Sequence, residues 1–167
     1  MKIAALQMTS GMDVAANLAT ATHLLESAAG EGAALAVLPE NFAFMGRDER
    51  DKRAMAETPG QGPIQDALAS LAARLKLAIV AGTLPLRVPG ESRCAAASLC
   101  YGADGRLLAR YDKIHLFDVD LPGHEERYRE SAGTVPGRDV VVADVAGVPV
   151  GMSVCYDMRF PELYRRM

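Results

Sequence analysis

Residues 33–40 read Ala33-Ala34-Leu35-Ala36-Val37-Leu38-Pro39-Glu40, an apolar run closed by a proline and an acid. Such a run is typical of a strand buried on both faces of a sheet, and proline is tolerated at its end because it cannot donate to the ladder. Comparable runs at residues 2–8 and 77–82 predict two more buried strands. We expect residues 2–8 to lie inside the sheet and Glu40 to stand at a strand end.

Helical periodicity separates these strands. Apolar residues recur at steps of three and four over residues 14–28, with Asp13 placed to cap the start and Gly30 to end the segment. The same spacing follows Pro63 over residues 64–75, and proline is favoured in the first turn of a helix. Both stretches predict amphipathic helices.

Later strands are expected to pair as hairpins. Residues 94–111 contain Asp104-Gly105 between two apolar runs, and residues 140–154 contain Ala146-Gly147 in the same way. Short turns of this composition favour antiparallel pairing. Strands that first alternate with helices and then form hairpins predict a mixed sheet with helices on its outer faces, of α/β or α+β class.

Two segments lack these patterns. Residues 48–57 are charged and predict a solvated helix or loop, whereas residues 118–137 are rich in Gly, Pro, Glu and Arg and predict a long loop. Loops of that length in a compact domain are often functional. The chain shows no internal repeat, so we expect residues 1–167 to form one domain.

The composition of the chain argues against several classes of function. Half of the residues are hydrophobic, and a net charge of -3 with scattered basic residues argues against nucleic acid as a partner. Without an apolar run near the roughly 20 residues that cross a bilayer, and without a signal-peptide pattern, we expect no membrane contact and a cytoplasmic location. Three cysteines without a CxxC pair and three scattered histidines predict neither disulfides nor a metal site.

Cys155 opens the segment Cys155-Tyr156-Asp157-Met158-Arg159-Phe160-Pro161-Glu162, directly after the last predicted strand and before a helix that starts near Pro161. A strand that turns sharply into a helix exposes a side chain at the turn, and backbone N–H groups there can stabilise an oxyanion. Cys155 is therefore a candidate nucleophile, although free cysteine is also common in protein cores.

Three charged residues are candidates to act with Cys155. Glu40 stands among aromatic and apolar residues that would desolvate its carboxylate and favour a role as a base. Lys113 occupies an apolar neighbourhood at a strand end, and Glu130 lies in a polar loop. Taken one at a time, each of the three also fits a solvated surface charge.

In chain order, three segments together resemble the signature motifs of the nitrilase superfamily of carbon-nitrogen hydrolases. They are Leu38-Pro39-Glu40, Tyr111-Asp112-Lys113-Ile114-His115-Leu116-Phe117 and the segment that begins at Cys155. The likeness also includes Gln7 in the opening strand and Glu130-Ser131, so it extends over essentially the whole chain.

This resemblance implies a four-layer α-β-β-α sandwich and a catalytic triad of Glu40, Lys113 and Cys155. In that scheme Glu40 is the general base, and Cys155 attacks the amide carbon. Lys113 and the backbone N–H of Tyr156 face the developing oxyanion. Glu130 matches an accessory glutamate that positions the substrate or the lysine, and the scheme requires no cofactor and no metal.

Further expectations concern the region around the cysteine. Asp157, Arg159 and Glu162 are expected to hold the elbow and a subunit contact through hydrogen bonds, with His115 as a supporting residue. Relatives commonly dimerise near this region, which implies a homodimer or a higher homo-oligomer. The family domain normally continues past the cysteine elbow, whereas this chain ends at Met167. We therefore expect an incomplete domain whose C-terminal part is missing, with unpaired sheet positions and uncovered apolar faces.

Within the superfamily, residues 116–123 and the segment that begins at Cys155 most resemble Nit-type amidases. These enzymes hydrolyse small ω-amides, among them deaminated glutathione and α-keto acid amides. The expected reaction is therefore hydrolysis of a small carboxylate-bearing amide through a cysteine thioester, with release of ammonia.

Three other functions remain open on the sequence. An acyltransferase of the same superfamily would pass the thioester to an acceptor other than water. A truncated chain could instead be an inactive binding or assembly module. A nucleotide-binding α/β domain would share the early alternation of strands and helices, but no GxGxxG run or P-loop opens a predicted helix.

Overall fold

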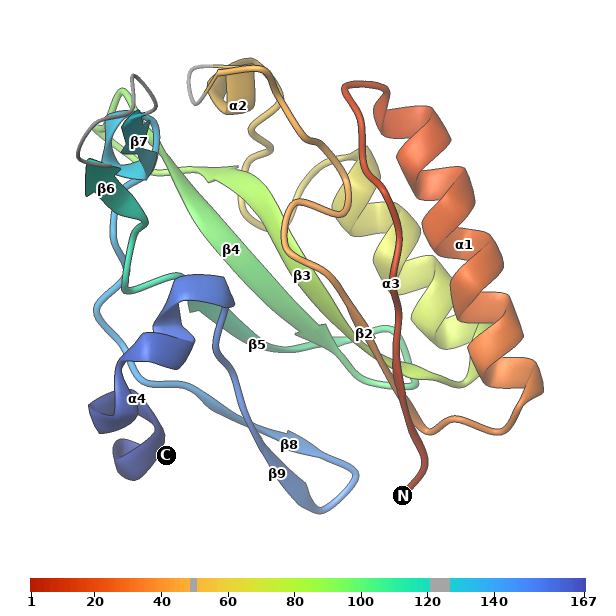
Figure 1. Ribbon diagram of the computed structural model, residues 1–167. Helices are drawn as coiled ribbons and strands as arrows, with labels where there is room; N and C mark the ends of the chain where they lie inside the picture. The colour runs from red at the N-terminus through yellow and green to blue at the C-terminus, as the bar shows by residue number, and fades with distance from the viewer. Residues whose placement is uncertain (49–50, 121–126) are drawn as a thin grey trace.

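A computed structural model describes residues 1–48, 51–120 and 127–167 of the chain. Its centre is a mixed sheet with the strand order β1-β2-β3-β4-β5 (Figure 1). The first three strands run parallel and the last three antiparallel, as the change from alternation to hairpins predicts. The strands are β1 (Ile3–Ala5), β2 (Leu35–Leu38), β3 (Ala78–Arg87), β4 (Cys94–Tyr101) and β5 (Leu107–Asp112).

Two long helices, α1 (Val14–Gly30) and α3 (Pro63–Leu75), lie side by side on one face of this sheet (Figure 1). The side chain of Asp13 accepts the backbone N–H of Ala16 at 3.1 Å and caps α1 as predicted. The apolar stripes of both helices face the sheet and form the larger hydrophobic core. Its members include Leu25, Leu68, Ile79 and Leu99.

A hairpin of β8 (Val142–Val145) and β9 (Val148–Gly151) covers part of the opposite face. Its turn residues Ala146 and Gly147 both have positive φ, 53° and 82°, the conformation of a tight hairpin turn. A second, smaller core fills the space between hairpin and sheet, with Tyr111 fully buried in it. Helices, sheet and hairpin thus form successive layers of an α/β fold. The chain ends in the short helix α4 (Pro161–Arg166).

The position predicted for the first strand is wrong. β1 lies at an edge of the five-stranded sheet, and Ile3 is 56% exposed. The apolar pattern indicates a strand, but it does not indicate which strands flank it.

The segment predicted as a solvated helix or loop is partly buried. It contains the helix α2 (Asp51–Ala54), and the side chains of Lys52 and Glu57 are both withdrawn from solvent. The Glu57 carboxylate accepts the backbone N–H groups of Ile64 and Gln65 at 2.7 and 3.2 Å. Because these are N–H groups of the first turn of α3, Glu57 caps that helix in place of a local residue.

The segment predicted as a long loop, residues 118–137, carries regular structure. β6 (Asp118–Asp120) and β7 (Arg127–Arg129) pair antiparallel, and a 3-10 turn, η1 (Glu130–Ala132), follows them. Residues 121–126, which include part of the run that resembles Nit-type amidases, lie outside the described residues. Within the described ranges, no helix has both the length and the apolar character needed to cross a membrane.

Candidate active site

Glu40 lies in the turn that follows β2, where the carboxyl end of the strand reaches the edge of the sheet. β3 passes so close to this turn that a Cβ on Gly82 would clash with the backbone carbonyl of Pro39. The next residue, Thr83, accepts the backbone N–H of Asn41 through its hydroxyl at 2.9 Å. Asn41 itself has a φ of 56°, in the left-handed region. The close approach of β3 and the hydrogen bond between Asn41 and Thr83 fix the backbone on both sides of Glu40 and so hold this residue in place at the end of β2.

Lys113 directly follows β5 and is 1% exposed. Its Nζ lies 2.8 Å from Oε1 of Glu40 and 2.8 Å from Oε2 of Glu130. Burial on its own lowers the pKa of Lys113, but the hydrogen bonds to Glu130 and Glu40 and the charges of both carboxylates outweigh it, so the pKa is raised. The ammonium therefore stays charged, held between two carboxylates.

Glu130 belongs to η1 and is buried. Besides Lys113 it accepts the backbone N–H of Phe117 at 2.7 Å. The η1 turn is anchored to the start of β4, where the N–H of Cys94 donates to the carbonyl of Gly133 at 3.1 Å. Glu130 is thus a fixed part of the site, and the interpretation as a solvated surface charge is wrong for it.

Cys155 occupies the predicted elbow, between the end of the β8-β9 hairpin and the 3-10 turn η2 (Cys155–Arg159). Its φ of 49° is in the left-handed region, which non-glycine residues rarely adopt outside tight turns and functional sites. It is the exposed cysteine of the chain, whereas Cys94 and Cys100 are buried. The interpretation as a core cysteine is therefore wrong.

The groups around the Cys155 thiol keep it protonated. Its pKa is raised by desolvation first, then by the charge of Glu40 and a hydrogen bond to Glu40, while Lys113 opposes this shift. A neutral thiol beside a carboxylate can become a nucleophile when that carboxylate takes its proton during attack. Glu40, Lys113, Glu130 and Cys155 are accordingly brought together from four separate parts of the chain.

Asp157 is fully buried and holds the elbow in place through hydrogen bonds. Its carboxylate accepts the hydroxyl of Tyr111 at 2.6 Å and the backbone N–H groups of Val154 and His115 at 2.8 and 3.1 Å. The Nδ1 of His115 lies 2.7 Å from the same carboxylate. The imidazole of His115 also stacks on Phe160, with ring centroids 3.6 Å apart. Asp157 and His115 therefore have the supporting positions predicted for them.

Tyr156 packs its ring between two aromatic residues. The ring meets Phe117 edge-on with centroids 5.1 Å apart, and it meets Phe160 at 5.4 Å in the same manner. Edge-to-face pairs of this kind stabilise a fixed arrangement. The side chain of Tyr156 thus connects the elbow to Phe117, a residue of the cavity wall.

A cavity of about 390 Å³ opens above these groups, within the range of small-molecule sites. The sequence did not single out several of its lining residues. Lys52 comes from the segment expected to be solvated, and Tyr128 and Arg129 belong to β7, in the segment expected to be a loop. The cavity is lined by Glu40, Asn41, Met45, Lys52, Lys113, Phe117, Tyr128, Arg129, Glu130 and Cys155.

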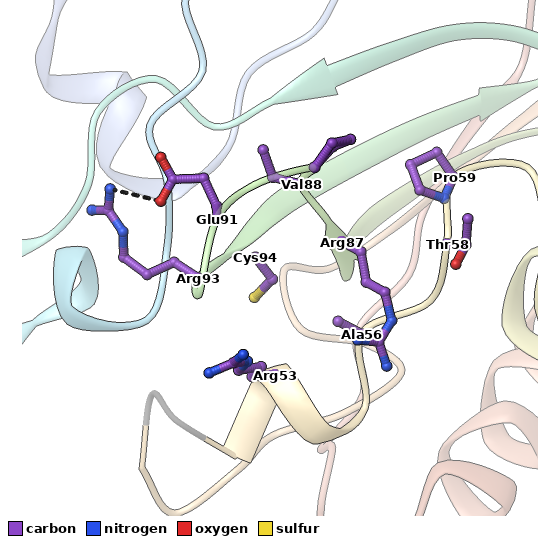
Figure 2. A pocket seen from close by; sticks show the side chains of 10 residues that line it. Arg53, Ala56, Thr58, Pro59, Arg87, Val88, Glu91, Arg93 and Cys94 are labelled. Carbon is purple, nitrogen blue, oxygen red and sulfur yellow. Dashed lines mark hydrogen bonds and ion pairs between the residues drawn. The ribbon is translucent and has the colours of Figure 1, made fainter.

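Figure 2 shows a second cavity, of about 240 Å³, which is lined in part by the short helix α2. Arg53 of α2 lines it together with Arg87 at the end of β3 and Arg93 before β4. Arg93 pairs with Glu91 at 3.5 Å and donates to the carbonyl of Ser131 at 3.2 Å. The hydrogen bond from Arg93 to the carbonyl of Ser131 also anchors the η1 turn.

In the part of the chain that the structure describes, no group of three or more His, Cys, Asp or Glu side chains is arranged to hold a metal ion. The cavity brings together the thiol of Cys155, the carboxylates of Glu40 and Glu130 and the ammonium of Lys113. Together they can move a proton, form a covalent bond to carbon and stabilise a negative charge.

The family model for carbon-nitrogen hydrolases matches residues 2–167. Among curated proteins, the deaminated glutathione amidase of Synechocystis sp. is 42% identical over 166 residues, which cover 97% of this chain and 60% of that protein. The omega-amidase NIT2 of Danio rerio is 34% identical, over 97% of this chain and 57% of that protein. The chain thus spans less than two thirds of the length of these relatives.

Solved structures agree with the sequence matches. The C. elegans NitFhit protein superposes with a TM-score of 0.86 at 31% identity, over 96% of this chain and 39% of that one. A mutant of the amidase from Nesterenkonia sp. AN1 superposes with a TM-score of 0.81 at 28% identity, over 99% of this chain and 61% of that one. In that amidase, acrylamide has undergone Michael addition at the active-site cysteine.

Proposed function

The chain belongs to the carbon-nitrogen hydrolase family, in the nitrilase superfamily, and on that premise we propose that it carries the active site of an amidase. The observation that carries this proposal is the position of Lys113 Nζ, 2.8 Å from both Glu40 and Glu130 in the cavity to which Cys155 is exposed. The acrylamide adduct of the related amidase supports Cys155 as the nucleophile.

The first half of the reaction forms a thioester. Glu40 takes the thiol proton of Cys155 as the sulfur attacks the carbonyl carbon of the amide. The carbonyl oxygen becomes an oxyanion that faces the ammonium of Lys113 and the backbone N–H of Tyr156. Glu40 then gives its proton to the amide nitrogen, the carbon–nitrogen bond breaks, and ammonia leaves.

The second half hydrolyses the thioester. Glu40 removes a proton from a water molecule as the water oxygen attacks the acyl carbon, and the carbon–sulfur bond then breaks. The proton returns to the sulfur, so the products are a carboxylic acid and the original thiol. Glu130 keeps the charge of Lys113 in place through both halves and so acts as a positioning residue.

A small carboxylate-bearing amide is the substrate class that we propose. The related proteins are named for deaminated glutathione and for ω-amides. A cavity of about 390 Å³ suits a molecule of that size.

The proposal is tested by intact-mass spectrometry of the purified protein after incubation with an α-keto ω-amide, with ammonia followed in parallel. We expect ammonia to be released by the wild type and not by the Cys155→Ala variant, with a mass increase on the wild type that matches the acyl group. Added amines separate hydrolysis from acyl transfer, because a transferase would give the amide of the added amine. Absence of both ammonia and adduct would contradict the proposal.

We also propose a cytoplasmic homo-oligomer that associates near the elbow. Met158 of η2 and Tyr164 of α4 are 67% and 44% exposed, and exposed apolar side chains that gather on one surface often mark an interface. Light scattering on the purified protein is expected to give at least twice the mass of one chain. The Met158→Lys variant is expected to shift that mass toward one chain, whereas a monomeric wild type would contradict the proposal.

A further inference from the structure

The cavity of about 240 Å³ in Figure 2 carries positive charge that the proposed reaction does not use. Three arginines line it, Arg53, Arg87 and Arg93, against the single carboxylate of Glu91, which leaves two formal positive charges. We refer to it as the arginine cavity. The whole chain has a net charge of -3, so the excess is local. Because a hollow lined by charge of one sign concentrates ions of the opposite sign, the arginine cavity favours an anion.

The three arginines come from separate segments, and hydrogen bonds place two of these segments. Arg53 belongs to α2, Arg87 closes β3, and Arg93 directly precedes β4. The backbone N–H of Arg87 donates to the carbonyl of Glu57 at 2.8 Å, which joins the end of β3 to the chain that follows α2. The guanidinium of Arg93 donates to the carbonyl of Ser131 at 3.2 Å. That guanidinium is therefore already held in place on the cavity wall.

The other two guanidiniums have donors to offer. Both Arg53 and Arg87 are exposed, and among the described residues neither forms a side-chain hydrogen bond or an ion pair. A guanidinium presents its N–H groups as a planar fork that matches two oxygens of a phosphate or a carboxylate. Thr58 adds a hydroxyl to the same wall. The cavity thus has several donors suited to one oxygen-rich anion.

The size and the remaining walls of the cavity restrict what it can hold. Its volume is below the roughly 300–1,000 Å³ of ordinary ligand pockets, which favours an anion of few atoms. Apolar walls exclude water and strengthen a charged contact. Among the described residues, none lines both this cavity and the catalytic one. The apolar part of the wall consists of Ala56, Pro59, Val88 and Pro89.

We propose that the arginine cavity binds a small dianion, a phosphate group or a short dicarboxylate, through Arg53, Arg87 and Arg93. Two negative charges on the ligand balance the two formal positive charges of the wall. Glu91 opposes binding, because it adds a negative charge and occupies a donor of Arg93 at 3.5 Å. The site is separate from amide hydrolysis, so the inference goes beyond the proposed function and does not depend on it.

Isothermal titration calorimetry at constant ionic strength and about pH 8 measures the binding of inorganic phosphate, which is mostly a dianion at that pH. Arg53→Gln and Arg87→Gln should each weaken binding about tenfold, since charge-assisted hydrogen bonds are the strong ones. Arg74→Gln is the matched control, because it removes the same charge from α3, where Arg74 pairs with Glu26 on the surface. It should change the affinity by less than about twofold.

Glu91→Gln gives a prediction of the opposite sign. The variant removes the opposing carboxylate and releases a donor of Arg93, so phosphate should bind about threefold more tightly. A gain of affinity cannot come from partial unfolding. Unchanged or weaker binding in Glu91→Gln contradicts the proposed role of the cavity charges.

Succinate and acetate complete the comparison. Acetate carries one negative charge, so it should bind at least about tenfold more weakly than the better of phosphate and succinate. The better of those two identifies the ligand class as a phosphate group or a dicarboxylate. Equal binding of all three anions, or equal losses in Arg74→Gln and Arg87→Gln, overturns the inference.

Alkylation of Cys155 separates the arginine cavity from the catalytic one. Cys155 is exposed whereas Cys94 and Cys100 are buried, so iodoacetamide should add one group, which the intact mass verifies. The alkylated protein should bind phosphate as tightly as the wild type. A loss of about tenfold would place the anion at Cys155 and refute the site. Because no amide is turned over in these measurements, failure of the amidase proposal would leave their outcome unaffected.

Discussion

The Glu40→Gln variant is expected to lose amide hydrolysis by about a thousandfold, because a glutamine cannot take the thiol proton and general-base catalysis contributes roughly 10²–10⁴-fold. The same change should make the thiol easier to ionise. The charge of Glu40 and its hydrogen bond to Cys155 both raise the pKa of that thiol, so their removal lowers it. Turnover and simple thiol reactivity should therefore change in opposite directions.

Two measurements on one preparation test this. Ammonia release gives the loss of turnover, and the pH dependence of alkylation by iodoacetamide gives the pKa of Cys155. The midpoint of alkylation in the wild type should lie above the ordinary cysteine value, and the midpoint in Glu40→Gln should lie lower than in the wild type. Glu26→Gln, which removes a surface carboxylate paired with Arg74, is the control and should change neither. Turnover within tenfold of the wild type in Glu40→Gln would exclude Glu40 as the base.

Asp157→Ala should cause the largest loss of stability, about 3–5 kcal/mol, as expected when one partner of a buried charged network is removed. Its carboxylate accepts four donors with no exposure to solvent, and the alanine would leave them buried without an acceptor. For a chain of this size, each kcal/mol corresponds to roughly 2–4 °C in Tm, so we expect a decrease of about 10 °C.

Thermal unfolding followed by circular dichroism measures this effect. The matched control is Asp104→Ala, which removes an exposed aspartate of the β4-β5 turn that accepts from Arg106. That variant should leave Tm almost unchanged, since exposed charge pairs contribute little. Equal losses in the two variants would show that the buried network does not stabilise the elbow.

The sequence predicted the local structure around the candidate site residues. Glu40, Lys113 and Cys155 each follow a strand, and strand ends are recognisable because apolar runs stop at proline, charge or a turn. The pattern alone left each of these residues open as a surface charge or a core cysteine, and the resemblance to the nitrilase superfamily combined them into one candidate site. The pattern could not show that the β8-β9 hairpin, which belongs to a separate sheet, brings Cys155 beside the ends of β2 and β5. Asp157 and His115 were recognised from the same motifs as supporting residues.

The parts that sequence reasoning missed depend on distant contacts. Lys52 stands in a charged segment that resembles a solvated helix, and its burial arises only because α2 is held beside the cavity by the surrounding chain. Glu57 belongs to the same segment but caps α3, a role that no local capping pattern indicates. The edge position of β1 was missed for a related reason, since an apolar run shows that a strand forms but not which neighbours it has.

The left-handed backbone at Cys155 has a consequence for how this position is retained. A side chain in that conformation costs roughly 1–2 kcal/mol relative to the right-handed region, whereas a glycine would adopt it without steric penalty. Folding and reactivity therefore make competing demands on a single residue. As the proposed nucleophile, Cys155 would serve the reaction at a cost to folding, so selection for stability alone would act against a cysteine at this elbow.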